Sequence, residues 1–170
     1  MKKQTVKIVT VIIAVFVALT ACRGKSAGSE ADELDTAIRE ASDYLNDNIP
    51  AGGKTVILNI QSDSEELSDY IIEGLYSNAV NDNVFSVIDR KQLDLVTAEL
   101  NFRLSGEVSD DSAVQIGRML GVQTIVSGEA GKSGNGYRLR IRAMDVQTAQ
   151  IQGQFSRNIP SSRKMTALMK

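Results

Sequence analysis

Apolar and polar positions alternate along the chain in rhythms that predict its helices and strands. Residues 84–128 have the pattern of a strand, a helix, a loop, a second helix and a second strand. The first strand is the apolar run 84–88. Asp89 then stands where a helix N-cap belongs, with Gln92 three residues later as its capping-box partner. Gly121 is placed to end the second helix.

Upstream of this block, the sequence predicts a helix, a strand and another helix. The strand is the almost unbroken apolar run 55–60, as expected when both faces of a strand are covered. Ser62 and Glu65 form a capping box that would start the following helix. Strands joined by helices predict parallel pairing with right-handed crossovers. The inward-facing helical positions are Leu34, Ile38, Ala41 and Leu45, then Leu67, Ile71, Leu75 and Val80.

After residue 128 the period changes to two, which predicts a pair of antiparallel strands, each with one apolar face. Residues 131–136 are predicted as a hairpin loop and residues 147–149 as a second turn. The first strand alternates Tyr137, Leu139, Ile141 and Ala143 with Arg138, Arg140 and Arg142, and the second alternates Ile151, Gly153 and Phe155 with Gln150, Gln152 and Gln154. In the remaining stretch, Met165, Leu168 and Met169 have helical spacing.

These elements predict a single α/β domain. It would have a mixed sheet of about five strands with helices packed on it, in the order α-β-α-β-α-α-β-β-β, closed by a C-terminal antiparallel hairpin. We place this domain at residues 34–159 and treat residues 160–170 as a C-terminal tail.

The first 22 residues have the features of a lipoprotein signal. Three lysines are followed by an apolar run that is too short for a comfortable membrane span. Leu19-Thr20-Ala21-Cys22 matches the bacterial lipobox, which predicts a signal peptide over residues 1–21 and acylation of Cys22. The alternative is a plain secretory signal followed by a stray thiol. Residues 22–33 form a short polar tether, and Arg23 favours the outer membrane facing the periplasm.

Composition argues against catalysis. The chain has 170 residues and no histidine, which removes the commonest general base and metal ligand. The segment from Gly128 to Ser133 has too few residues between its glycines for a phosphate-binding loop, and it joins two strands. Helix caps and the helix dipole explain the acidic cluster of Asp63, Glu65, Glu66 and Asp69, and Asp89 likewise has a capping role. We therefore predict no enzymatic activity, no cofactor, no metal site and no nucleic-acid binding, although a hydrolase remains a weaker alternative.

The clearest surface feature is a row of arginines. Arg138, Arg140 and Arg142 share one face of their strand, and Gln150, Gln152 and Gln154 are expected on the same side of the next strand. We hypothesise that this face docks a protein partner or a second copy of the chain, since arginine and amide groups suit interface hydrogen bonding. The alternative is a solvated sheet face whose arginines pair with nearby acids.

Charge is unevenly distributed along the chain. Residues 30–82 hold 13 acids and 2 bases, whereas residues 131–170 hold 8 bases and 1 acid. Such a molecule could pack head to tail with itself or steer an acidic partner. The alternative is internal neutralisation, with the acidic helix over the basic strands.

Three stretches resemble the CsgG/HfaB family of envelope lipoproteins. They read VIDRKQLDLVTAEL, AVQIGRMLGVQTIVSGE and YRLRIRAMDVQTAQI, and the similarity covers residues 54–155. The family includes the curli secretion subunit and the LpoB-type activators of penicillin-binding proteins. The resemblance implies an anticodon-binding-like fold. Family members tend to have a glycine where this chain has Ala149, which leaves the geometry of the second turn open.

Two functions follow from this resemblance. The first is a non-enzymatic envelope lipoprotein that binds and regulates a peptidoglycan-synthesising penicillin-binding protein. The alternative is an oligomeric subunit of a curli-type secretion or envelope-assembly scaffold. No segment has the alternating pattern of a membrane-spanning barrel, so we expect any such assembly to lack its own pore. The short tether also favours a partner near the anchoring membrane.

Overall fold

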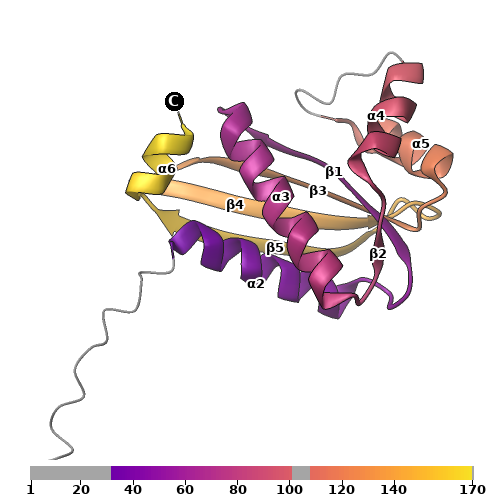
Figure 1. Cartoon of the computed structure of the whole chain (residues 1–170), viewed down its shortest axis with the longest axis horizontal. Helices are drawn as coiled ribbons and strands as arrows, with labels where there is room; N and C mark the ends of the chain where they lie inside the picture. Colours follow the sequence, from indigo (N-terminus) through magenta and orange to yellow (C-terminus); the bar gives the residue numbers. More distant parts are fainter. Residues whose placement is uncertain (1–31, 101–107, 170) are drawn as a thin grey trace, which may run out of the picture. The chain divides into compact units, whose positions relative to one another are not determined.

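A five-stranded mixed sheet with helices on both faces forms the framework of the chain (Figure 1). The computed structural model describes residues 32–100 and 108–169. The predicted signal peptide, Cys22 and most of the tether lie outside these residues. In chain order the elements are α2 (Glu33–Asn48), β1 (Lys54–Ser62), α3 (Glu65–Asp82), β2 (Ser86–Val87), α4 (Arg90–Glu99), α5 (Asp110–Leu120), β3 (Thr124–Ser133), β4 (Gly136–Asp145), β5 (Ile151–Pro160) and α6 (Arg163–Leu168).

The sheet combines a parallel half with an antiparallel half. Its strand order is β2-β1-β3-β4-β5. β1 pairs in parallel with β2 and β3, whereas β3, β4 and β5 are antiparallel neighbours. This arrangement confirms the predicted single α/β domain with a parallel core and a C-terminal hairpin. The short helix α6 follows the last strand.

Two hydrophobic cores lie on opposite faces of the sheet, because successive strand residues point to opposite sides. The larger core packs Ile57, Val126 and Ile141 against α2 and α3. The smaller core packs Val56, Ile125 and Met144 against α4 and α5. We call these sides the α2/α3 face and the α4/α5 face.

Helix caps follow the predicted chemistry at Asp89 and Gly121, although the Asp89 side chain binds the amide of Lys91 and not that of its predicted partner Gln92. Asp89 is the N-cap of α4, and its side chain accepts a hydrogen bond from the Lys91 amide. Gly121 ends α5 with a φ of 65°, in the left-handed region. The predicted capping box at Ser62 is wrong, because the N-cap of α3 is Ser64, which accepts from the Leu67 amide. Ser62 instead donates to the Ser64 carbonyl.

Three further expectations differ from the structure. The hairpin loop is shorter than predicted, because β3 continues to Ser133 and β4 begins at Gly136. Val80 is 53% exposed, and Ala79 takes the buried position on α3. The strand predicted over 84–88 pairs only at Ser86–Val87. Among the residues that the structure describes, no helix has both the length and the apolar character needed to cross a membrane.

Candidate protein-binding surface

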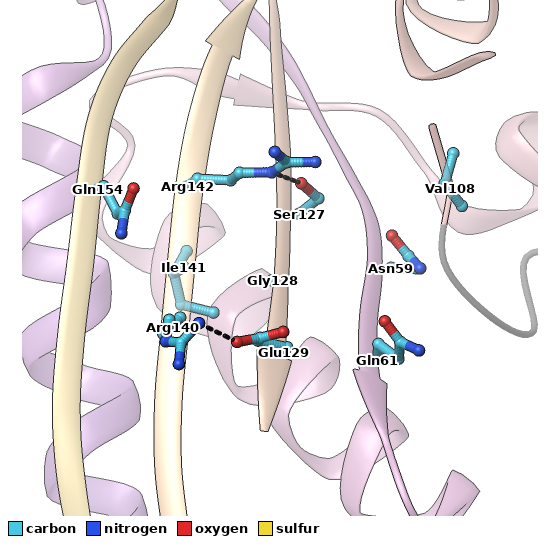
Figure 2. Close-up of a pocket in the computed structure, with 10 residues that line it drawn as sticks. All are labelled: Asn59, Gln61, Val108, Ser127, Gly128, Glu129, Arg140, Ile141, Arg142 and Gln154. Atoms are coloured by element: carbon cyan, nitrogen blue, oxygen red, sulfur yellow. Dashed lines mark hydrogen bonds and ion pairs between the residues drawn. The ribbon is translucent and has the colours of Figure 1, made fainter. Parts of the chain in front are cut away.

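The α4/α5 face of the sheet carries a polar groove of about 250 Å³, and Figure 2 shows the side chains that line it. A second hollow, of about 260 Å³, shares Gln61, Glu129 and Arg140 with the first and continues toward Arg138. The groove is lined by Asn59, Gln61, Val108, Ser127, Gly128, Glu129, Arg140, Ile141, Arg142 and Gln154.

Strand register places these side chains in two rows across the sheet. Arg142 pairs with Ser127 on one side and Gln154 on the other, and Ser127 is opposite Asn59. One step along, Arg140 lies between Glu129 and Ser156. The alternation of strand residues therefore converts spacing in sequence into a continuous polar surface.

Each arginine of the row has a defined partner. Arg142 donates from Nε to Ser127 Oγ at 3.0 Å, and its Nη2 binds Asp110 Oδ1 at 2.6 Å. Arg140 forms an ion pair with Glu129 at 2.5 Å (Figure 2). These contacts hold the guanidinium groups over the sheet, in line with the alternative that the row pairs with nearby acids.

The ion pairs are too exposed to fix the arginines permanently. The side chains of Arg140 and Glu129 are 48% and 49% exposed, and those of Arg142 and Asp110 are 36% and 54% exposed. Exposed pairs of this kind contribute about 0–1 kcal/mol. A carboxylate from a partner can therefore replace Glu129 or Asp110 at small cost, so pairing and docking are compatible.

The predicted site residues divide into two groups. Arg140, Arg142 and Gln154 line the main groove, and Arg138 lines the adjoining hollow, where its Nε donates to Asn158 Oδ1 at 2.8 Å. The other two glutamines lie apart from this cluster. The Gln152 side chain bonds Thr124 and Asp145, and Gln150 lies in the turn before β5.

Sequence reasoning missed the part of the groove contributed by β1 and β3. Asn59 and Gln61 in the second half of β1, and Ser127 and Glu129 in the middle of β3, are pairs of polar residues two positions apart. That spacing was an available signal. The alignment of Asn59 and Gln61 with the arginines was not, because it depends on a register shift in β1 between Ile57 and Asn59.

The charge asymmetry is neutralised in part within the domain. Arg157, on β5, binds Glu33 at 2.9 Å and also pairs with Glu40, both on α2. The hydrogen bond that Arg157 donates to the Glu40 carboxylate is the main reason that the pKa of Arg157 is raised. The acidic helix therefore lies over basic β5, as the alternative of internal neutralisation requires, whereas the arginine row projects from the opposite face.

A second polar cluster joins α6 to the helical layer. Lys164 binds both oxygens of Asp35, at 2.6 and 2.7 Å, and lies 4.3 Å from the centroid of the Tyr70 ring. Burial alone would raise the pKa of Asp35, but hydrogen bonds from Lys164 and Tyr70 outweigh it and hold that pKa below its ordinary value. The pKa of Lys164 is raised, because contacts with Asp35 and Tyr70 outweigh the lowering caused by burial.

Comparisons with known proteins agree with this architecture. The model of the curli production assembly/transport component CsgG matches residues 54–136. No curated protein matches the chain in sequence.

Among solved structures, the LpoB C-terminal domain from Salmonella enterica superimposes with a TM-score of 0.65 at 18% identity, covering 75% of this chain and 98% of that one. The same domain from Escherichia coli gives 0.64 at 18% identity, with the same coverage. At this identity the likeness establishes the fold. The chain therefore has the fold of the LpoB C-terminal domain, and its residues 54–136 are similar to the CsgG family.

Proposed function

We propose that the chain is a bacterial envelope lipoprotein that regulates a peptidoglycan-synthesising penicillin-binding protein by binding it. The polar groove on the α4/α5 face would be the docking surface. Its arginine row, Arg138, Arg140 and Arg142, is the observation that carries the proposal, because arginine is enriched among the residues that anchor protein interfaces and these three share one face of β4.

The groove favours binding over catalysis. It is open, and its charged groups are arginines and exposed carboxylates already engaged in ion pairs. General acid–base chemistry would require a catalytic group positioned against a substrate in a more enclosed pocket. An open polar groove of this kind instead suits a partner that presents acidic and amide groups.

The lipid anchor is part of this proposal. Acylation of Cys22 would hold the domain to the outer membrane on its periplasmic side. The nine residues from Arg23 to Ala31 reach about 30 Å when fully extended. The partner's docking domain must therefore come close to the anchoring membrane. Its greatest distance from the membrane is the reach of the tether plus the diameter of the described domain.

A binding measurement tests the proposal. The complete chain is immobilised through its anchor, and the bifunctional penicillin-binding protein of the same organism is passed over it at two salt concentrations. We expect saturable binding that weakens at least about tenfold when Arg138, Arg140 and Arg142 are changed to Glu. Reversing the exposed Arg90, Lys91 and Arg118 serves as a matched control of equal charge change and should leave binding unchanged. Equal binding by both triple variants would refute the docking surface.

The CsgG match supports a second candidate, an oligomeric subunit of a secretion or envelope-assembly scaffold. Mass measurement of the complete chain in detergent separates the candidates. A monomer supports the regulator, whereas a stable ring of several copies supports the scaffold.

A further inference from the structure

The outer edge of β5 is a free edge of the sheet. β5 is last in the strand order, and its ten residues pair with β4 on one side only. Natural sheets usually protect such edges with lysines, bulges or covering segments. Within the described residues, a register irregularity lies near the start of β5, the Tyr44 hydroxyl binds the Gln154 amide, and Pro160 has no amide hydrogen at the last position, so the stretch between Gln154 and Pro160 is the least protected.

One hydrogen bond identifies which backbone groups face outward. The Gln154 amide donates to Tyr44 Oη at 3.1 Å, so it points away from β4. In an antiparallel strand, outward and inward amides alternate. The amides and carbonyls of Ser156 and Asn158 therefore also face outward, and both residues are exposed.

The two flanks of this edge differ in charge. On the α2/α3 face, Glu33, Glu40 and Asp47 recur every seven residues along α2 and so form one stripe beside β5. Arg157 is the basic residue that binds this stripe. On the α4/α5 face, the side chains of Ser156 and Asn158 lie beside Arg140 and Arg138.

We propose that β5, from Gln154 to Asn158, receives an extended segment of a protein partner as a sixth strand. Alternate side chains of that segment point to opposite faces. Basic side chains would therefore lie over the α2 stripe, and acidic or amide side chains would lie over the arginine row. A partner carbonyl would take the place of the Tyr44 hydroxyl at the Gln154 amide.

Charge argues against a second copy as the occupant. Pairing β5 with β5 of another copy would bring the two acidic α2 stripes together, with both Arg157 residues already engaged. Like charges in such proximity oppose association. This inference rests on the proposed function in one respect: the added strand would belong to the same protein that docks at the groove. The experiment below uses a model peptide, so it needs no penicillin-binding protein.

The test uses a short blocked peptide, Lys-Thr-Val-Glu-Lys-Thr-Val-Glu, whose lysines and glutamates occupy alternate faces. Amide hydrogen exchange of the complete chain in detergent is followed by NMR with and without the peptide. We expect exchange at Ser156 and Asn158 to slow by at least about tenfold at saturation. The same peptide N-methylated at alternate residues should give no protection, because its edge-facing amides are blocked.

Matched variants locate the contact on the protein. Ser156→Pro removes an outward amide without touching the pairing with β4 and should abolish the protection at Asn158, whereas Ser156→Ala should preserve it. Three results would overturn the inference: no protection by the peptide, equal protection by the N-methylated peptide, or protection that grows with protein concentration alone. The last result would assign the edge to a second copy, and none of them bears on whether the groove binds a penicillin-binding protein.

Discussion

At the residue scale, Ala149 adopts a backbone conformation that suits glycine. Its φ is 58°, in the left-handed region, and its amide donates to the Asp145 carbonyl at 2.9 Å to close the turn between β4 and β5. A residue with a Cβ in this region costs about 1 kcal/mol. The turn forms nonetheless, because the Asp145 carboxylate accepts from the Thr148 and Gln147 amides, which also hold the pKa of Asp145 below its ordinary value.

Ala149→Gly should therefore stabilise the domain. We expect the free energy of unfolding to rise by about 0.5–1 kcal/mol in denaturant titration. Ala98→Gly, at an exposed position of α4, is the control and should lower it by a similar amount. If Ala149→Gly lowered the free energy of unfolding, the backbone of Ala149 could not be strained as described.

Two glycines of β3 provide an opposite pair of predictions. A Cβ at Gly128 would overlap the Arg140 carbonyl oxygen and lie 2.8 Å from Ile141 Cδ1, whereas a Cβ at Gly131 would meet nothing within 4 Å. Gly128→Ala should cost about 1–3 kcal/mol of stability, and Gly131→Ala should change it by less than about 0.5 kcal/mol. Thermal unfolding of the two variants measures the difference. Equal unfolding midpoints would contradict the close packing of Gly128 against Arg140 and Ile141.

At the element scale, α6 is attached to the helical layer by both apolar and polar contacts. Met165 is buried in the larger core, and Ser64 Oγ donates to the Leu168 carbonyl at 2.5 Å. The Asp35–Lys164 pair adds a contact that depends on pH. Because the pKa of Asp35 is lowered on folding, its stabilising contribution is present above the unfolded-state value near 3.8 and is lost as the pH falls through the folded-state value.

Lys164→Met keeps most of the apolar stem and removes the charge. We expect this variant to be less stable than the native chain at pH 7 by at most about 1 kcal/mol. The difference should shrink as the pH falls below the unfolded-state pKa of Asp35 near 3.8, and vanish once Asp35 is protonated in the folded chain. Unfolding titrations across this range measure it. Arg163→Met, on the exposed side of the same helix, should show no such pH dependence, and a difference that persists at low pH would exclude the Asp35 pairing.

Most elements could be predicted from the sequence because their signals are local. The apolar face of α2, formed by Leu34, Ile38, Ala41 and Leu45, is buried as expected. Asp89 and Gly121 cap the helices that they were predicted to cap. The error at Ser62 is also local, since Ser64 offers an equivalent hydroxyl two residues later. Such competition between neighbouring caps cannot be resolved by spacing alone.

The candidate surface was less predictable because it is assembled from distant segments. The arginine row followed from the alternation in β4, but the expected glutamine row did not. An irregular register between Ala143 and Met144 displaces the start of β5, so Gln152 turns to Thr124 and Asp145, and Gln154 alone reaches the groove. Bulges of this kind leave no clear trace in a single sequence.

At the scale of the whole molecule, the described domain has surfaces of different character on the two sides of the sheet. Acidic α2 and α3 cover one face, and part of their charge is neutralised by Arg157 and Lys164. The opposite face exposes the arginine row. This arrangement leaves the row available to an acidic or amide-rich partner, because the main acidic helices lie on the other side of the sheet.

This arrangement also predicts how the chain behaves alone. The exposed arginine–carboxylate pairs give little free energy for self-association, so we expect the complete chain in detergent to be a monomer at micromolar concentration by light scattering. A concentration-independent ring that dissociates on reversing Arg138, Arg140 and Arg142 would favour the scaffold.

The most direct test of the central claim is the rate of glycan polymerisation by the bifunctional penicillin-binding protein of the same organism. The rate is measured alone, with the native chain, and with variants confirmed by circular dichroism to be folded. The account predicts that the native chain and the control variant of Arg90, Lys91 and Arg118 change the rate equally, and that changing Arg138, Arg140 and Arg142 to Glu abolishes the effect. An unchanged rate with the native chain, or an equal effect from the arginine-row variant, would contradict it.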